Sequence, residues 1–371
     1  MPSVDIVKSV PIVKTPRLIQ LEGIFEVPPA SDSINTWSVD LPFEEKEWSV
    51  GLIVGPSGSG KTTIAHKLFG DAIMPHYDWP SDKSLVDAFP RDMGIKDIAK
   101  ILSSVGFSSP PSWVRPFLAL SNGEQFRVTI ARGLAEKPDL LVCDEFTSVV
   151  DRTVAQIASA AVAKAVRKRE GQFVAVACHY DVIDWLQPDW VYDTRSYSFT
   201  WRSVQRHPPV ELSIYRTDHK TWALFGKHHY MNTSLNRSAH CFVAFREDEP
   251  VAFTAWLPHL SGGRGGAGRR EHRTVCLPDY QGIGLGNALS VKVASIYKSM
   301  GIRAVSTTSH PAIIGYRYGS PLWRVVRKPG TQIGKATGKL GGSVRDMSMT
   351  GGFRYIGPEA DKLEAHLILD W

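Results

Sequence analysis

Short, nearly all-apolar runs alternate with longer amphipathic stretches along residues 1–200. The apolar runs predict buried strands at residues 49–54, 138–143 and 172–178. The amphipathic stretches predict helices at residues 62–70, 95–105, 123–136 and 151–168. Strands of this kind, alternating with helices, are typical of a parallel sheet covered on both faces. Residues 17–28 alternate differently and predict a pair of strands.

The pattern changes after about residue 205, where His207, Pro208 and Pro209 interrupt it. The elements predicted beyond this point are a helix around 220–230, a hairpin of 241–245 and 251–257, a strand at 274–277, a helix at 289–299 and a strand at 303–307. We therefore expect two domains, residues 1–205 with an α/β fold and residues 206–371 with an α+β fold.

Charge is divided unevenly between these two parts. Residues 1–200 carry 20 Lys and Arg against 25 Asp and Glu, a net charge of −5. Residues 201–371 carry 23 against 12, a net charge of +11. A strongly basic half predicts a polyanionic partner. The alternative is a basic surface that only keeps the protein soluble.

No run of apolar residues is long enough for a membrane-spanning helix, and residues 1–21 lack the apolar centre of a signal peptide. The four cysteines stand apart, without metal-ligand spacing. We therefore expect a cytoplasmic protein with reduced thiols and no membrane partner.

A glycine-rich loop, GPSGSGKT at residues 55–62, follows the first buried strand and opens a helix. In such a P-loop the backbone N–H groups face the phosphates of ATP, Lys61 reaches the β- and γ-phosphates, and Thr62 coordinates Mg²⁺. The predicted nucleotide ligands here are Gly55, Ser57, Gly58, Gly60, Lys61, Thr62 and Thr63.

Two carboxylates end the second buried strand, DLLVCDE. Asp144 is placed to hold Mg²⁺, directly or through water, and Glu145 is placed to polarise the attacking water. Together with the P-loop they predict ATP hydrolysis.

Further motifs follow in a fixed order: LSNGEQ at residues 120–125, SVVD at 148–151, and His179 after the strand FVAVAC. In this order they resemble the signature motif, D-loop and switch histidine of ATP-binding-cassette (ABC) ATPases, over residues 17–200. The resemblance implies a homodimer that sandwiches two ATP molecules. Ser121 and Gly123 of one subunit would meet the γ-phosphate on Lys61 of the other, with Asp151 in the D-loop nearby.

The sequence departs from this family at several points. Asn122 and Glu124 differ from the commonest signature motif, and Tyr77-Asp78-Trp79 stands where a glutamine is usual. The segment between P-loop and signature motif, where transporter ATPases dock their membrane partners, is short, which disfavours a transporter. Phe25 is a candidate for stacking on adenine, or else a residue of a strand core.

A second glycine-rich loop, QGIGLG at residues 281–286, also lies between a strand and a helix. It resembles the loop of GNAT acetyltransferases, over residues 209–357, although a generic strand–turn–helix connection is the alternative. The resemblance implies that the loop binds the pyrophosphate of acetyl-CoA or another acyl-CoA; its residues are Gln281, Gly282, Ile283, Gly284, Leu285 and Gly286. Tyr316 lies at the position where such proteins often have a tyrosine that protonates the leaving thiolate of CoA. Tyr318 is the second candidate for this role.

The acceptor substrate is suggested by other residues. The segment KHHY, residues 227–230, is similar to that of Mom-like GNAT proteins, which modify adenine in phage DNA. His229 or Tyr230 could deprotonate or orient an amine, and packing is the alternative role. Basic residues for a nucleic acid, DNA rather than RNA, are Arg264, Arg269, Arg270, Arg324, Arg327 and Lys328. They could instead lie in solvated loops or serve the 3′-phosphate of coenzyme A.

We therefore expect an ATPase fused to an N-acyltransferase that modifies an amine of a nucleic-acid base, with ATP-driven dimer closure clamping the polymer. One alternative is a protein or small-molecule N-acetyltransferase regulated by the ATPase. Another is an ATP switch with a non-catalytic GNAT-like module.

Overall fold

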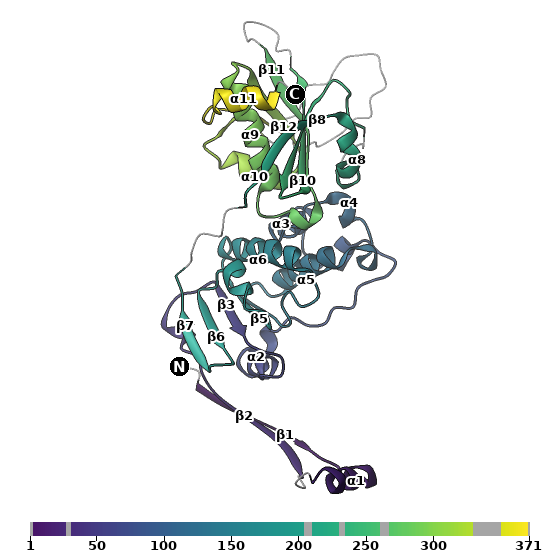
Figure 1. Ribbon diagram of the computed structural model, residues 1–371, viewed down its shortest axis with the longest axis vertical. Coiled ribbons are helices and arrows are strands. Elements are labelled where there is room, and N and C mark those ends of the chain that lie inside the picture. The colour runs from purple at the N-terminus through teal and green to yellow at the C-terminus, as the bar shows by residue number, and fades with distance from the viewer. Residues whose placement is uncertain are drawn as a thin grey trace. The chain divides into compact units, whose positions relative to one another are not determined.

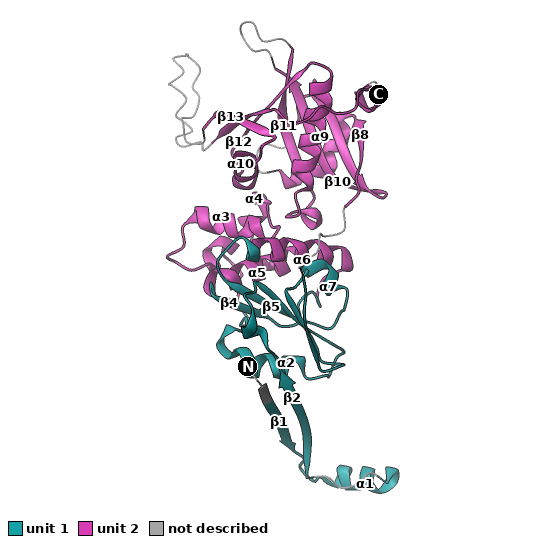
Figure 2. Ribbon diagram, turned by 90° about the vertical axis from the view of Figure 1, so that its left-hand side faces the viewer, with its two compact units in different colours: residues 1–76, 137–148, 166–205 teal, residues 77–136, 149–165, 206–371 magenta. Residues whose placement is uncertain are grey.

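The computed structural model describes residues 3–26, 31–203, 210–229, 234–259, 267–328 and 350–369. The chain forms two compact units that interleave in sequence. Unit 1 contains residues 1–76, 137–148 and 166–205, and unit 2 contains residues 77–136, 149–165 and 206–371 (Figure 2). The predicted domain division at 205/206 stays a prediction, and the interrupting residues 207–209 lie outside the described part of the chain.

Unit 1 is built on a five-stranded sheet in the order β4-β5-β3-β6-β7. The parallel strands are β3 (Val50–Val54), β4 (Leu140–Cys143), β5 (Gln172–Ala177) and β6 (Trp190–Asp193), and β7 (Ser198–Trp201) is antiparallel. Every residue of β3 is buried. Gly51 is required in β3 because a Cβ there would lie 2.1 Å from the Trp190 ring. The predicted α/β class is confirmed, with a mixed rather than wholly parallel sheet.

Two short helices of unit 1 connect its strands, α2 (Lys61–Phe69) and α7 (Val182–Leu186). The hydrophobic core joins Ile64 of α2 to Ile53, Val142 and Val174 of the sheet. The P-loop therefore lies between a fully buried strand and a helix that the core holds in place.

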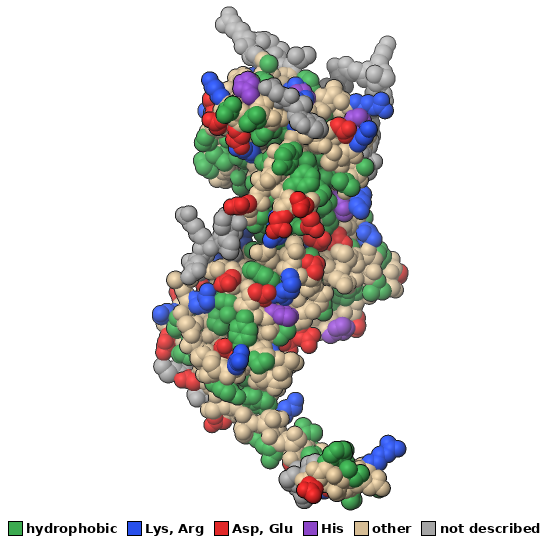
Figure 3. Space-filling model, in the orientation of Figure 1, with side chains coloured by type: hydrophobic (Ala, Val, Ile, Leu, Met, Phe, Trp, Pro, Cys, Tyr) green, Lys and Arg blue, Asp and Glu red, His purple; other side chains and the backbone are tan. Residues whose placement is uncertain are grey.

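An N-terminal hairpin of β1 (Ser3–Pro11) and β2 (Asp32–Asp40) carries α1 (Pro16–Phe25) at its far end (Figure 1). The prediction of strands at 17–28 is wrong, because Thr15 caps the N–H of Leu18 and Pro16 occupies the first helical position. No residue of α1 is buried. Figure 3, in which α1 lies at the bottom, shows hydrophobic side chains on the surface of this helix.

The helical part of unit 2 consists of η3 (Leu85–Ala88), α3 (Ile95–Ser104), α4 (Pro110–Trp113), η4 (Phe117–Ala119), α5 (Asn122–Glu136) and the unit 2 portion of α6 (Arg152–Arg167). Within the same unit, α5 contacts the turn η7 (Pro278–Tyr280) and α3 contacts α10 (Pro311–Tyr318). The predicted signature-motif helix is thus packed on the fold formed by the C-terminal residues.

That fold contains a seven-stranded sheet in the order β13-β14-β12-β11-β10-β9-β8. The strands are β8 (Ser213–Thr217), β9 (His240–Arg246), β10 (Glu249–Pro258), β11 (Gly268–Cys276), β12 (Arg303–Thr308), β13 (Trp323–Arg327) and β14 (Gly351–Tyr355). All neighbours are antiparallel except β11 and β12. The predicted hairpin, β9 with β10, is confirmed.

Helices cover this sheet on both faces. On one face α9 (Leu285–Ser299) packs against Trp256 and Phe353, and α11 (Lys362–Leu369) lies beside α9. On the other face α8 (Trp222–Phe225) packs against Phe253. The predicted helix at 220–230 is broken into η5 (His219–Thr221), α8 and η6 (Gly226–His228).

The two parallel strands separate along their length. β11 and β12 are paired only from Gly268 with Arg303 to Glu271 with Ser306, and both strands continue beyond the last pair. The divergence lies next to the loop at residues 281–286, which leads into α9. No helix among the described residues has the length and apolar character needed to cross a membrane.

Candidate functional site

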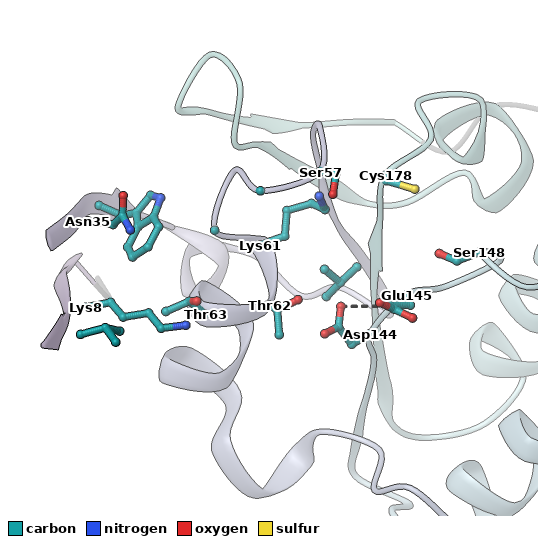
Figure 4. Close-up of a pocket in the computed structure, with 15 residues that line it drawn as sticks. Lys8, Asn35, Ser57, Lys61, Thr62, Thr63, Asp144, Glu145, Ser148 and Cys178 are labelled. Carbon is teal, nitrogen blue, oxygen red and sulfur yellow. Dashed lines mark hydrogen bonds between the residues drawn. The ribbon is translucent and has the colours of Figure 1, made fainter. Parts of the chain in front are cut away.

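A pocket of about 510 Å³ opens beside the P-loop in unit 1 (Figure 4). It is lined by Ser57, Gly58, Gly60, Lys61, Thr62 and Thr63 of the loop and by Asp144, Glu145 and Ser148 after β4. Gly60 has φ +88°, and a Cβ there would lie 2.4 Å from the Trp37 ring. Gly55 belongs to the same loop and follows β3. The structure therefore brings the predicted phosphate and metal ligands together.

The charged side chains of the pocket are held in distinct ways. Lys61 Nζ donates to the carbonyl of Pro56 at 2.7 Å, so the lysine lies along the loop. The N–H of Glu145 donates to Asp144 Oδ1 at 2.8 Å, and Glu145 has the left-handed φ of +51°. Thr62 and Asp144 both line the pocket and are labelled in Figure 4. A hydroxyl beside a carboxylate is a donor set that suits Mg²⁺.

Trp37 of β2 is the functional residue that the sequence did not suggest. It lines the pocket with Lys8 and Asn35, whereas Phe25 lies on α1 with 70% of its surface exposed. Phe25 is not among the residues that line the pocket, whereas Trp37 is, and the assignment of an adenine-stacking residue stays a prediction. The available signal was the alternation of residues 32–40, which predicts a strand but not that it reaches the P-loop.

His179 follows β5 and is exposed, and the neighbouring Cys178 is the residue that lines the pocket. Its assignment as a switch histidine stays a prediction. Ser121, Gly123 and Asp151 belong to unit 2, whereas the pocket belongs to unit 1.

The departure at Glu124 has a local cause. Ser121 and Glu124 form a capping box at the start of α5: the Glu124 N–H lies 3.3 Å from Ser121 Oγ, and the Ser121 N–H donates to Glu124 Oε2 at 3.0 Å. Ser112 Oγ also donates to Glu124 Oε1 at 2.8 Å. Glu124 therefore stabilises the helix N-terminus and is buried, while Asn122 beside it is exposed. Asp151 similarly caps α6 through the N–H of Val154.

The loop at residues 281–286 adopts left-handed conformations at Gly282 (φ +97°) and Gly284 (φ +100°), and Gly284 caps α9. Leu285 is buried in the core, and the Cys276 thiol donates to the carbonyl of Tyr280 at 3.3 Å. Burial raises the pKa of Cys276 to about 12. The thiol is therefore neutral and remains a hydrogen-bond donor to the turn before the loop.

Gln281 binds within the protein rather than pointing outward. Its Nε2 donates to the carbonyl of Cys276 at 2.9 Å, and its Oε1 accepts the N–H of Ser108 at 2.7 Å. A Cβ on Gly106 would lie 2.6 Å from the Gln281 carbonyl. The side chain of Gln281 thus ties the loop to the segment that follows α3.

Arg127 of α5 holds the turn before this loop. Its guanidinium donates to the carbonyls of Pro278 and Asp279, the latter at 2.8 Å. Arg127 is fully buried, and this burial lowers its pKa although Asp279 opposes the change. A helix that begins at the signature motif therefore contacts the turn before the predicted acyl-CoA loop through one buried cation.

Tyr316 lies on α10 with 41% of its surface exposed, and Tyr318 is more exposed. The next residue, Arg317, is buried and forms an ion pair with Glu271 at 2.8 Å. Arg317 also donates to Ser290 at 2.7 Å and stacks on Trp323. Burial alone would raise the pKa of Glu271, but the charge and hydrogen bonds of Arg317 lower it below its ordinary value. This pair anchors α10, which carries Tyr316, to the point where β11 and β12 separate.

The residues predicted to bind the acceptor substrate are partly buried or lie outside the described part of the chain. His229 is buried edge-on against Trp222 at 5.6 Å, which supports the packing alternative. Tyr230 lies outside the described residues, as does Arg264. Arg269 is half-buried, with Nη2 2.9 Å from His240 Nε2, and Arg327 donates to Thr350. The predicted basic residues with exposed side chains are Arg270, Arg324 and Lys328.

Comparison with known proteins separates the two parts of the chain. Residues 180–319 match the family model described as the acetyltransferase (GNAT) family. The phosphate import ATP-binding protein PstB of Mycoplasma mycoides is 31% identical over 159 residues, which cover 30% of this chain and 68% of PstB. The methionine import ATP-binding protein MetN of Cutibacterium acnes is 42% identical over 181 residues, which cover 38% of this chain and 48% of MetN.

Two further matches are partial. The oligopeptide transport ATP-binding protein OppD of Mycobacterium tuberculosis is 45% identical over 82 residues, and the chain covers 13% of OppD. A solved structure of cbiO1 from Clostridium perfringens, described as part of an ABC transporter complex, aligns with 43% of this chain and 76% of its own at 17% identity and a TM-score of 0.34.

These observations define a P-loop ATPase domain of the ABC class joined to a GNAT acetyltransferase domain. The chain belongs to the ATP-binding-cassette proteins. Both predicted resemblances are confirmed at this level, whereas the Mom-like assignment stays a prediction.

Proposed function

We propose that this protein hydrolyses ATP and transfers an acyl group from acyl-CoA to an amine of a nucleic-acid base, DNA rather than RNA. The observation that carries the proposal is the packing inside unit 2. There, the helix that begins at the signature motif binds the turn before the loop predicted to hold acyl-CoA, and the segment after α3 binds Gln281 of that loop. An ATPase element and an acyltransferase element in direct contact favour one coupled activity over two independent ones.

Each residue of the ATP site would have its own role in binding or hydrolysis. Lys61 and the loop amides would bind the phosphates, and Thr62 and Asp144 would hold Mg²⁺, which neutralises phosphate charge when bound. Glu145 would polarise the attacking water, with His179 beside the γ-phosphate. Ser121, Gly123 and Asp151 of a second subunit would complete the site, so ATP binding would close a homodimer.

For acyl transfer, the backbone N–H groups of residues 282–286 would bind the pyrophosphate of acyl-CoA. The amine nitrogen would attack the thioester carbonyl carbon, and the carbon–sulfur bond would break. Tyr316 would then give its proton to the departing thiolate, and the proton that the amine nitrogen loses would pass to solvent, from which Tyr316 is reprotonated. Closure of the dimer on the polymer would help to expose a base, a step that costs a few kcal/mol of unstacking.

Mass spectrometry of nucleosides tests the proposal. Host DNA and RNA would be digested with and without expression of the wild-type chain, Glu145→Gln and Tyr316→Phe. We expect a new modified nucleoside in DNA that disappears in both variants. Tyr318→Phe, a change of the same kind on the same helix, is expected to retain it. If no new nucleoside forms in either pool, base modification is excluded and acetylation of proteins or small amines takes its place.

One observation favours a second candidate, an ATP switch with a non-catalytic acyl-CoA module. The side chain of Gln281 is occupied within the protein, because it bonds the N–H of Ser108 and the carbonyl of Cys276. This candidate predicts acyl-CoA binding without turnover and no effect of Tyr316→Phe. A transporter role is disfavoured, because Ser108, in the short segment where transporter ATPases dock membrane partners, is bonded here to Gln281.

A further inference from the structure

Three arginines from distant parts of the sequence share one row of the seven-stranded sheet. Arg270 of β11 pairs with Val305 of β12, Val305 pairs with Arg354 of β14, and Arg354 pairs with Arg324 of β13. Residues directly opposite each other in a sheet project from the same face. The register therefore places the three guanidiniums on one face, across four strands.

The core identifies which face this is. Ala304, Phe353 and Trp323 alternate with the row residues along their strands, and all three pack in the cluster that contains α9. The arginines must therefore project from the opposite face. All three are exposed, as is Val326 beside Arg324.

The positive charge of the row is not neutralised locally. No ion pair joins these three guanidiniums to a carboxylate of the described residues. Arg324 and Arg354 are directly opposite, at the strand spacing of about 4.8 Å, and like charges at such positions repel. Two residues along β11 from Arg270, burial together with the charges of Arg273 and Arg270 lowers the pKa of His272 to about 4. The nearby histidine is thus neutral, and the charge belongs to the arginines.

We propose that Arg270, Arg324 and Arg354 form a binding row for the phosphate backbone of a nucleic acid. This inference rests on the proposed function and makes it more specific: of the predicted basic residues it keeps only Arg270 and Arg324, and it adds Arg354. Along the row, the strand spacing places the backbone of Arg354 about 5 Å from that of Arg324 and about 10 Å from that of Arg270, and each guanidinium can bind a phosphate through two parallel hydrogen bonds. Such contacts position the polymer without reading its sequence.

The test compares the triple variant Arg270→Gln, Arg324→Gln, Arg354→Gln with a control of equal charge. The control variant is Arg91→Gln, Lys96→Gln, Lys100→Gln, three exposed cations of the helical part of unit 2. Binding to a fluorescent DNA duplex and to its separated strand would be measured between about 50 and 200 mM salt. The slope of log K against log salt should become less negative by about 2 to 3 in the row variant and remain near the wild-type value in the control.

Two further readouts separate phosphate binding from other roles. Acyl-CoA affinity of the row variant should equal that of the wild type, and a loss would assign the row to the 3′-phosphate of coenzyme A and overturn the proposal. Its melting temperature should be equal or higher, because a repulsive pair is removed, and a clear fall would indicate a structural role instead.

The outcomes also separate this inference from the proposed function. If the wild type modifies a nucleoside but the row variant has the wild-type slope of log K against log salt, the three arginines do not bind phosphates. The proposed function would then remain supported. If the wild type shows no salt-dependent binding to either DNA, the nucleic-acid function and the row fail together.

Discussion

At the scale of single residues, Trp37 contributes an aromatic side chain to the lining of the pocket beside the P-loop. We expect Trp37→Ala to weaken ATP binding by about 5- to 150-fold, because stacking of a base on an aromatic ring contributes roughly 1 to 3 kcal/mol. Phe25→Ala, on the exposed helix α1, should leave the affinity unchanged. Titration calorimetry with ATP measures both. Trp37→Phe should retain most of the binding, and an unchanged affinity in Trp37→Ala would exclude stacking there.

Residues of this site differ in how far the sequence could reveal them. Lys61 and Thr62 were predictable because the loop, strand and helix that place them are contiguous. Trp37 was not, since its distance from Gly60 depends on how the hairpin β1–β2 packs beside the P-loop. Arg354 likewise acquires its neighbours only through strand register, because Arg324 and Arg270 are separated from it along the chain.

At the scale of elements, the ion pair of Glu271 with Arg317 holds α10 to the sheet and makes a pH-dependent contribution to stability. The pKa of Glu271 in the folded protein is lowered from its ordinary value of 4.5. The ionised carboxylate therefore stabilises the fold above that value, and the contribution is lost as the pH falls through the lower folded value. Glu271→Gln should reduce the free energy of unfolding at neutral pH by about 3 to 5 kcal/mol, because it leaves Arg317 buried without its partner.

Urea unfolding at a series of pH values measures this difference. The wild type should lose stability below about pH 4.5, whereas Glu271→Gln should show a flatter profile in the same range. Glu359→Gln removes an exposed carboxylate, so its free energy of unfolding should depend on pH as that of the wild type does. Parallel profiles for Glu271→Gln and the wild type would mean that the pair does not control acid stability.

The elements themselves were largely predictable where their pattern is local. Helices α2, α3, α5 and α6 lie within one or two residues of their predicted ranges, since each has a continuous amphipathic pattern. Helix α9 begins four residues before its predicted start, because Gly284 caps it from within the glycine-rich loop. Helix α1 was mistaken for strands, although Thr15 and Pro16 were the available start signal.

At the scale of the whole molecule, the segment at residues 106–109 gathers parts of unit 2 that are far apart in sequence. Ser108 bonds Gln281 and accepts a hydrogen bond from His310 Nε2 at 3.0 Å. Ser109 Oγ lies 3.4 Å from the carbonyl of His228. The acyl-CoA loop, the residue before α10 and the end of η6 thus meet one short segment after α3. No local pattern could predict this, because the contacts span more than 100 residues.

This arrangement predicts that ATP and acyl-CoA affect each other's binding, and Gly106 allows a test that changes no proposed ligand. Gly106 has φ +87°, and a Cβ there would collide with the Gln281 carbonyl at 2.6 Å. Gly301 has a similar φ of +71°, but its Cβ would meet nothing within 4 Å. Gly106→Ala and Gly301→Ala therefore share the backbone strain of roughly 1 to 2 kcal/mol, and only the first disturbs the contact.

The measurement is acyl-CoA affinity with and without ATP, in the Glu145→Gln background that retains the nucleotide. Without either glycine change, ATP should shift this affinity by about 5- to 150-fold, and by linkage acyl-CoA should shift ATP affinity by the same factor. Gly106→Ala should abolish the shift while each ligand still binds alone, and Gly301→Ala should preserve it. Equal losses in the two variants would trace the effect to general strain. The absence of any shift before either change would mean that the ATPase and acyltransferase elements, although in contact, do not communicate through this segment.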